Sequence, residues 1–202
     1  NRIVILFQSI TGTLGFKSKK VSSAPLDVYL GLTATIGSVL GAQIAIDMEA
    51  VLFNKILSII MVCVGLLILF QKKQSSFELS PQLVGKKRII STILFFFVGI
   101  YGGFINAGIG FVILLILTQI NNLSITQANS VKVVVVTFYT TVALLFFTYN
   151  KAVSLKLGMW MAIGSALSVL ITSRWSVKKG DNLIRYAVVV STAIISIKLW
   201  FF

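Results

Sequence analysis

Lys132 is the first residue that could do chemistry, because it lies near the interior of a long apolar stretch and has polar neighbours at helical spacing. Positions related by i, i+3 and i+7 share one face of a helix. On this criterion the Lys132 face also contains Asn129, Val136, Tyr139 and Thr140. The sequence therefore predicts a basic and hydrogen-bonding face on a helix that is otherwise apolar.

Arg2 is a second basic residue of this kind, and it lies just ahead of Gln8, Thr11 and Gly12 in another apolar stretch. A desolvated lysine or arginine pairs strongly with a carboxylate or a sulfonate, and nearby amides and hydroxyls donate further hydrogen bonds. Both cations also lie within a turn of a helix start, so snorkelling to lipid headgroups is the alternative interpretation. We predict that Arg2, Gln8, Asn129, Lys132 and Thr140 contribute to an anion site.

A glycine-rich stretch over 102–110 supplies the remaining candidate residues. Its glycines and one asparagine place irregular backbone in a hydrophobic region, which is tolerated only where it is buried in protein or lines a polar cavity. A helix that starts after Gly108 would direct free backbone N–H groups towards such a cavity and so favour an anion. The predicted binding residues here are Gly103, Asn106, Gly108 and Gly110. Close helix packing is the alternative, since Gly99 and Gly103 also form a GxxxG pattern.

The sequence lacks the residues that several kinds of chemistry require. The chain has no histidine, and its single cysteine, Cys63, cannot build a thiolate site or a disulfide. The five acidic residues lie in loops or at the ends of apolar stretches, and no nucleotide-binding glycine motif is present. We therefore expect no catalytic residues, no metal site, no cofactor and no enzymatic activity.

The composition indicates an integral membrane protein. Of the 202 residues, 57% are apolar and only 11% are charged, and the mean hydropathy is +0.98. A soluble domain of this size is about one quarter charged. The net charge of +13 comes from basic residues between the apolar stretches, where they mark cytoplasmic loops. Nucleic acid is therefore not an expected partner, whereas the lipid bilayer is.

The long apolar runs predict an all-α, polytopic bundle of transmembrane helices. A spanning helix needs roughly 20 apolar residues, and the runs do not alternate as the strands of a membrane barrel do. The expected spans are 2–16, 26–46, 51–70, 89–106, 129–149, 153–173 and 182–202, with a shorter apolar run at 109–120.

The short run at 109–120 decides the expected topology. If it returns the chain across the membrane, one side collects 13 of the 18 lysines and arginines; otherwise the division is 11 to 7. The positive-inside rule favours the first arrangement. It places the loops around Lys17, Lys72 and Lys178 in the cytoplasm and the C-terminus outside, in a multi-pass protein of the cell inner (plasma) membrane.

An internal repeat supports the same arrangement. Leu30-Gly31 and Ile36-Gly37-Ser38 recur 127 residues later as Leu157-Gly158 and Ile163-Gly164-Ser165. We expect repeat one at 1–70 without its N-terminal part, a cytoplasmic basic loop at 71–88 and repeat two at 89–202, facing opposite ways. Inverted repeats are a frequent plan of secondary transporters, with the substrate between the copies. The small-residue face Gly37–Gly41 is expected to pack helices, and such faces also allow a homodimer.

These motifs, in this order, resemble the TauE/SafE sulfite exporters, also called the 4-toluene sulfonate uptake permease family. Asn1-Arg2 through Gly41-Ala42 is similar to repeat one, and Gly99–Gly110, Asn129 to Lys132 and Gly164-Ser165 are similar to repeat two. The resemblance implies a secondary transporter of small anions, commonly sulfite or organosulfonates. It carries the glycine-rich loop onto 102–110 and the Asn-Arg motif onto Asn1 and Arg2.

The sequence thus predicts a transporter of small anions that works by alternating access through discontinuous helices. Two alternatives remain open at this point. One is a membrane scaffold or assembly protein whose glycines serve packing alone, and the other is an anion channel.

Overall fold

The computed structural model describes residues 1–18, 25–70, 86–154, 156–165, 190–191 and 193–198. The labelled helices are α1 (Arg2–Ser18), α2 (Leu26–Asp47), α3 (Ala50–Phe70), α4 (Lys86–Phe104), α5 (Ile109–Gln119) and α6 (Ile125–Tyr149). Further helical turns lie at 156–165 and 193–198, and no strand occurs in the described ranges. The predicted all-α class is confirmed.

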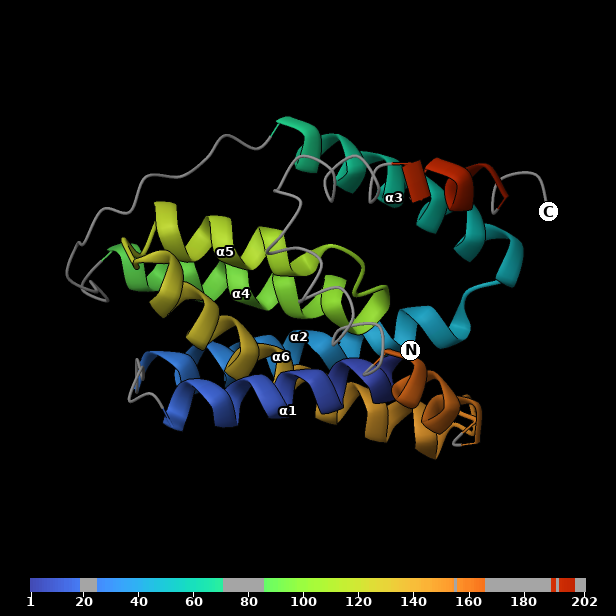
Figure 1. Cartoon of the computed structure of the whole chain (residues 1–202), viewed down its shortest axis with the longest axis horizontal. Helices are drawn as coiled ribbons and strands as arrows, with labels where there is room; N and C mark the ends of the chain where they lie inside the picture. The colour runs from blue at the N-terminus through green and yellow to red at the C-terminus, as the bar shows by residue number, and fades with distance from the viewer. Residues whose placement is uncertain (19–24, 71–85, 155, 166–189, 192, 199–202) are drawn as a thin grey trace.

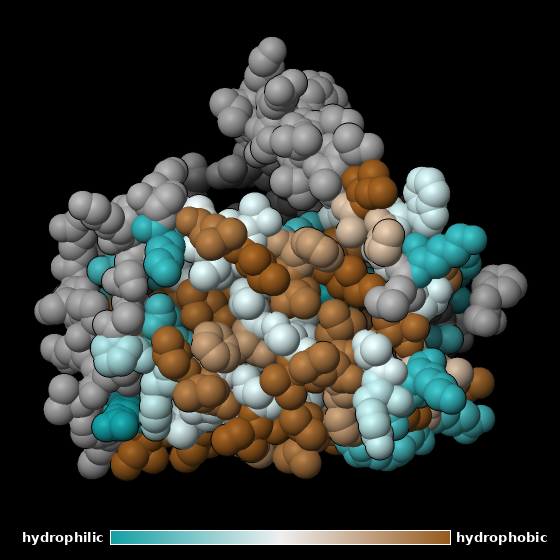
Figure 2. Space-filling model, turned by 90° about the horizontal axis from the view of Figure 1, so that it is seen from below, coloured by the Kyte–Doolittle hydropathy of each residue, from teal (hydrophilic) through white to brown (hydrophobic). Residues whose placement is uncertain are grey.

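Three of these helices are long and apolar enough to cross a membrane: Leu26–Asp47, Lys87–Phe104 and Ile125–Tyr149. Shorter apolar helices cover Ala50–Cys63 and Ile109–Gln119. At 1.5 Å per residue, the 25 residues of α6 extend for about 37 Å, which exceeds the roughly 30 Å hydrocarbon core. Figure 2 shows hydrophobic residues across the middle of one face and hydrophilic residues towards its two ends. This distribution fits a protein that lies within a bilayer.

Helices α2 and α4 approach each other at four glycines. A Cβ added at Gly37 would lie 2.9 Å from the backbone nitrogen of Ile100, and one added at Gly99 would lie 2.8 Å from the Cα of Ala34. Gly41 and Gly103 meet the opposite backbone in the same way. The predicted packing role of the small-residue face Gly37–Gly41 is therefore confirmed.

Helices α4 and α5 form an antiparallel hairpin, which Figure 1 shows in two shades of green. Near the beginning of α4, buried Ser91 accepts a hydrogen bond of 2.9 Å from the side-chain amide of buried Asn121, which follows α5. The short run at 109–120 therefore leads the chain back towards the end of the bundle where α4 begins, and its crossing of the membrane stays a prediction. The membrane side of that end stays a prediction.

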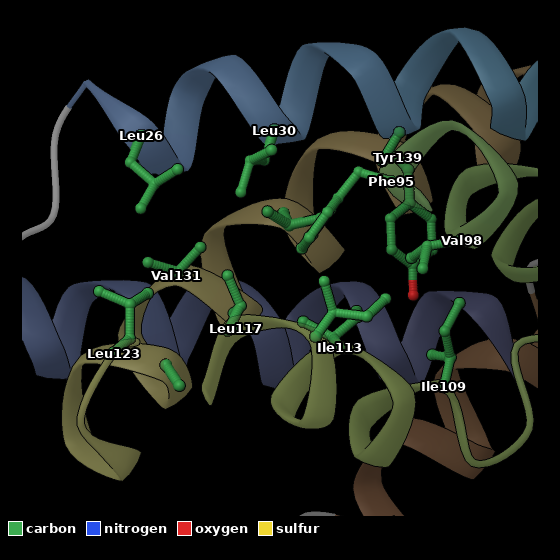
Figure 3. Close-up of a cluster of buried hydrophobic side chains, with 14 residues drawn as sticks. Leu26, Leu30, Phe95, Val98, Ile109, Ile113, Leu117, Leu123, Val131 and Tyr139 are labelled. Carbon is green, nitrogen blue, oxygen red and sulfur yellow. The ribbon is translucent and has the colours of Figure 1, made fainter. Parts of the chain in front are cut away.

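The apolar core lies between α2, α4, α5 and α6 (Figure 3). Leu30 of α2, Phe95 of α4, Ile113 of α5 and Val131 of α6 are all fully buried within it. Helix α1 packs along α6, since a Cβ added at Gly12 would lie 3.0 Å from a methyl group of Val133. The core thus fixes the α4–α5 hairpin against α2 and α6, which also pack directly on each other where Gly31 meets Phe138.

Parts of several expected features lie outside the described residues. These are the loops at 19–24 and 71–85, residues 166–189, and with them much of the expected spans 153–173 and 182–202. The inverted repeat therefore stays a prediction, as do the boundaries at 70 and 88.

Candidate functional site

A short non-helical connection joins Phe104, the last residue of α4, to Ile109, the first residue of α5. Two residues in this connection, Asn106 and Gly108, have positive φ angles of 66° and 68°. Glycine adopts this conformation without steric cost, and asparagine tolerates it better than most side chains do. These two residues, rather than the whole glycine run, therefore turn the chain from α4 into α5.

Two tyrosines hold this connection. The hydroxyl of Tyr139, from α6, donates a 2.7 Å hydrogen bond to the Oδ1 atom of Asn106. The hydroxyl of Tyr101, from the last turns of α4, donates to the backbone carbonyl of Ala107. Tyr139 is fully buried, and Figure 3 shows its hydroxyl pointing towards the α5 side of the core. The α4–α5 connection is thus fixed at its backbone by Tyr101 and at the side chain of Asn106 by Tyr139.

Arg2 lies at the end of α4. Its guanidinium donates hydrogen bonds to the carbonyl of Gly102 at 3.0 Å, to the carbonyl of Gly103, and to the carbonyl of Phe104 at 3.1 Å. It also lies 4.4 Å from the ring centroid of Phe147, at the end of α6. The last carbonyls of a helix lack intrahelical partners and carry its negative dipole end, so Arg2 caps α4. In this arrangement α1, α4 and α6 are joined at one point.

Lys132 lies beside the beginning of α5. A Cβ added at Gly110 would be 3.6 Å from the Cδ atom of Lys132, and the lysine side chain is half-buried. Its ammonium donates a 2.7 Å hydrogen bond to the Oδ1 atom of Asn129, whose amide in turn donates to the carbonyl of Ile125. Among the residues that the structure describes, no ion pair to Lys132 is seen. The positive charge next to the first turn of α5 is therefore not neutralised by an acidic side chain in that part of the chain.

The predicted site residues fall into two groups on either side of the α4–α5 connection. Arg2, Gly103 and Asn106 lie around the end of α4. Lys132 lies beside the beginning of α5 and is paired with Asn129 on α6. Gly108 and Gly110 lie between these groups. Their predicted role in binding an anion stays a prediction.

Three of the predicted residues have additional or separate environments. Gly103 packs against the backbone of Ser38, so it serves the α2–α4 contact. Gln8 donates a 2.5 Å hydrogen bond to Ser165, within the helical turns at 156–165. Thr140 is fully buried in α6. The structure gives no contact that brings Gln8 or Thr140 to the α5 N-terminus.

Tyr101 and Tyr139 are not among the site residues that the sequence predicts. Tyr139 shares the Lys132 face, but nothing in its spacing identifies Asn106 as its partner. A signal was nevertheless present, because a tyrosine within an apolar helix needs a hydrogen-bond partner for its hydroxyl when it is buried. Two such tyrosines near a glycine-rich interruption therefore mark the segment that they hold.

Apolar helices of membrane-spanning length surround the α4–α5 connection, which has a partly buried arginine and lysine beside it. Polar and charged groups within membrane helices mark binding sites and substrate pathways. Fold and site together define the class of polytopic membrane transport proteins.

The family model described as "Sulfite exporter TauE/SafE" matches residues 1–199, so the chain belongs to the TauE/SafE sulfite exporter family. This is a family of membrane transporters and not of enzymes. The resemblance seen in the sequence is therefore confirmed, and the protein is a membrane transporter.

Two curated relatives support this assignment. The "Probable membrane transporter protein YfcA" of Escherichia coli (strain K12) is 27% identical over 200 residues, which cover 98% of this chain and 73% of the relative. The "Probable membrane transporter protein" of Haemophilus influenzae is 23% identical over 204 residues, covering 98% of this chain and 77% of the relative. No solved structure matches the chain significantly.

Proposed function

We propose that this transporter carries small oxyanions, with sulfite or an organosulfonate as its substrate, by alternating access. The observation that carries the proposal is the position of Lys132 beside the first turn of α5. The ammonium group supplies charge for the anion, and the helix end supplies hydrogen-bond donors.

The donors at the α5 N-terminus follow from helix geometry. The first N–H groups of an α-helix have no carbonyl four residues earlier within that helix, and the positive end of the helix dipole lies there. The N-cap residue is Gly108, which has no side chain that could accept a hydrogen bond from them. The N–H groups of Ile109 and Gly110 are therefore available to the oxygens of a ligand.

The absence of a side chain at Gly110 matters for the same reason. A Cβ there would already be in van der Waals contact with Lys132, at 3.6 Å from its Cδ atom, and a larger side chain would fill the space beside the lysine stem. Glycine leaves this space to a ligand. The lysine, the glycine and the helix end together favour a compact anion.

Alternating access requires two halves that move against each other, and the packing of α1 on α6 supports this part of the proposal. The two helices run in opposite directions along each other (Figure 1), as equivalent helices of two inverted copies would. Beyond the contact of Arg2 with Phe147, Gly12 lies against Val133, and the hydroxyls of Thr13 and Thr137 are 3.4 Å apart. The glycine keeps this part of the contact narrow, and a shift of one helix along the other would have to release Arg2 from Phe147.

The test is counterflow of isotope-labelled sulfite in proteoliposomes, with an organosulfonate as the competitor. The wild-type protein should show saturable exchange that the competitor reduces. Lys132→Ala should abolish exchange while the protein remains in the membrane, and Lys132→Arg should retain part of it because the charge is kept. Lys17→Ala, at an exposed lysine near the end of α1, is the matched control and should exchange like the wild type.

The other outcomes identify the alternatives. Unchanged exchange in Lys132→Ala would remove the role proposed for the lysine. Flux that does not saturate with substrate concentration would indicate a channel. If folded wild-type protein exchanges no anion, a membrane scaffold becomes the better interpretation.

A further inference from the structure

We propose that Tyr139 is a positioning residue that orients the side-chain amide of Asn106 as a hydrogen-bond donor to the transported anion. This inference rests on the proposed function and extends it to a donor on the α4–α5 connection. It assigns a role to a buried hydroxyl and a buried amide that the sequence did not connect.

The contact between the two side chains determines which way the amide faces. Tyr139 donates its one hydroxyl hydrogen to the Oδ1 atom of Asn106, at 2.7 Å. With the oxygen used in this way, the NH2 group of the amide lies on the other side. Rotating the amide by half a turn would leave the Tyr139 hydrogen without this acceptor in a buried place, which is energetically costly.

The NH2 group of Asn106 is the unusual part of this arrangement. Its Nδ2 atom is buried, and within the described part of the chain it has no hydrogen-bond partner. Such an unpaired buried donor is rare in folded proteins, because its desolvation is not compensated. A ligand that accepts hydrogen bonds at this position would provide the missing compensation.

The Tyr139 ring is held firmly enough to act as a positioning group. It is fully buried in the core, and a Cβ added at Gly102 would lie 2.7 Å from its Cε2 atom. The ring therefore occupies the space that the missing side chain of Gly102 leaves. Since Gly102 belongs to α4 and Tyr139 to α6, the hydroxyl is fixed relative to both helices.

The position of Asn106 relates this donor to the proposed anion site. Asn106 lies two residues before Gly108, the N-cap of α5, and its positive φ of 66° helps to turn the chain into that helix. Asn106 therefore lies at the same helix end as the N–H groups of Ile109 and Gly110. A small oxyanion with two or more acceptor oxygens fits both kinds of donor.

The test measures the KM and maximal rate of sulfite exchange for Tyr139→Phe in proteoliposomes, together with the membrane abundance of each variant. Phenylalanine preserves the ring packing and removes the hydroxyl, so the amide is free to rotate. Because a hydrogen bond to a charged group contributes more than a neutral one, we expect KM to rise about tenfold with the maximal rate within about twofold. Tyr29→Phe, which removes a hydroxyl paired with Thr92 at the other end of α4, should leave KM unchanged.

Tyr101→Phe separates positioning from a general loosening of the connection. It removes the hydrogen bond to the carbonyl of Ala107 and leaves the Asn106 amide paired with Tyr139. Its effect on KM should be well below that of Tyr139→Phe. Equal effects of the two variants would overturn the inference, as would a loss of abundance in Tyr139→Phe with KM unchanged.

Asn106→Asp keeps the test decisive if Tyr139→Phe does not accumulate. Aspartate tolerates the same backbone conformation and still accepts from Tyr139, but it replaces the donor by a negative charge. Exchange should be lost from folded protein, whereas normal exchange in this variant would overturn the inference. Failure of the proposed function is distinguishable, because the wild-type protein itself would then exchange no anion.

Discussion

Replacing Gly99 by alanine tests how closely α2 and α4 must approach each other. In the wild-type structure the position of the added Cβ is 2.8 Å from the Cα atom of Ala34 on the opposite helix. Carbon atoms in van der Waals contact are about 3.5–4.0 Å apart, and the carbonyl oxygen of Ala34 lies closer still to the added Cβ, so the two helices have to separate by at least about 1 Å. A rotamer change cannot relieve this overlap, because both partners are backbone atoms or attached directly to the backbone.

The free-energy change follows from two opposing effects. Overpacking of this kind destabilises a protein by about 1–3 kcal/mol, and the upper end applies where backbone must move. Alanine offsets up to about 1 kcal/mol of this through its higher helix propensity. The expected net loss is about 2 kcal/mol, which lowers the Tm of a chain of this size by roughly 4–8 °C.

Thermal unfolding in detergent, followed by far-ultraviolet circular dichroism, measures this change. Gly15→Ala in α1 is the matched control, because its added Cβ would meet no atom within 4 Å. It should be at least as stable as the wild type. If Gly99→Ala unfolds at the same temperature as Gly15→Ala, the close glycine contact does not contribute to stability and the reasoning is refuted.

Three further experiments probe the two ends of the α4–α5 hairpin. Arg2→Gln removes the charged cap of α4 and should lower the free energy of unfolding by about 2 kcal/mol, with Arg2→Lys intermediate. A wild-type Tm for Arg2→Gln would exclude the capping role. Gly108→Ala places a side chain at a φ of 68° and should lower the free energy of unfolding by about 1 kcal/mol. Gly108→Asn should recover most of this loss, and equal Tm values for the two variants would argue against backbone strain. In a double-mutant cycle on the buried pair Ser91 and Asn121, alanine substitutions should couple by about 1 kcal/mol, and strictly additive losses would show that the pair is not energetically linked.

The helical class and the approximate spans were predictable because a bilayer requires long apolar helices whose backbone bonds are satisfied internally. The expected span 26–46 is close to α2 at Leu26–Asp47. Helix α6 begins earlier than the expected residue 129, because Ser124 and Gln127 form a capping box that starts the helix at Ile125. That Ser-x-x-Gln pattern is visible in the sequence, so this boundary could have been predicted from local signals.

The roles of the individual glycines could not be separated from the sequence. Glycine permits a positive φ and also permits close approach of two backbones, and the residue type alone does not distinguish these uses. Gly108 serves the turn into α5, whereas Gly99 and Gly103 serve packing against α2. The distinction depends on which helix faces each glycine.

Most contacts of the candidate site could not be predicted from the sequence, for a related reason. Lys132 and Asn129 lie three residues apart on one helix, so their pairing follows from local spacing. Arg2 and its acceptors on α4, and Tyr139 and Asn106, are brought together only by packing between helices. Such pairings depend on the arrangement of the whole bundle.

The cap that Arg2 places on α4 has a consequence for the biogenesis of the protein. Arg2 precedes its three acceptor carbonyls by 100 to 102 residues. At about 5–20 residues per second, the ribosome needs roughly 5–20 s to produce this length of chain. A guanidinium group without partners is costly inside the hydrocarbon region, so the Arg2 end of α1 must remain at the membrane surface during that interval. Helix α1 therefore docks against α4 and α6 as a late step of membrane insertion, after the helices that it contacts have been synthesised.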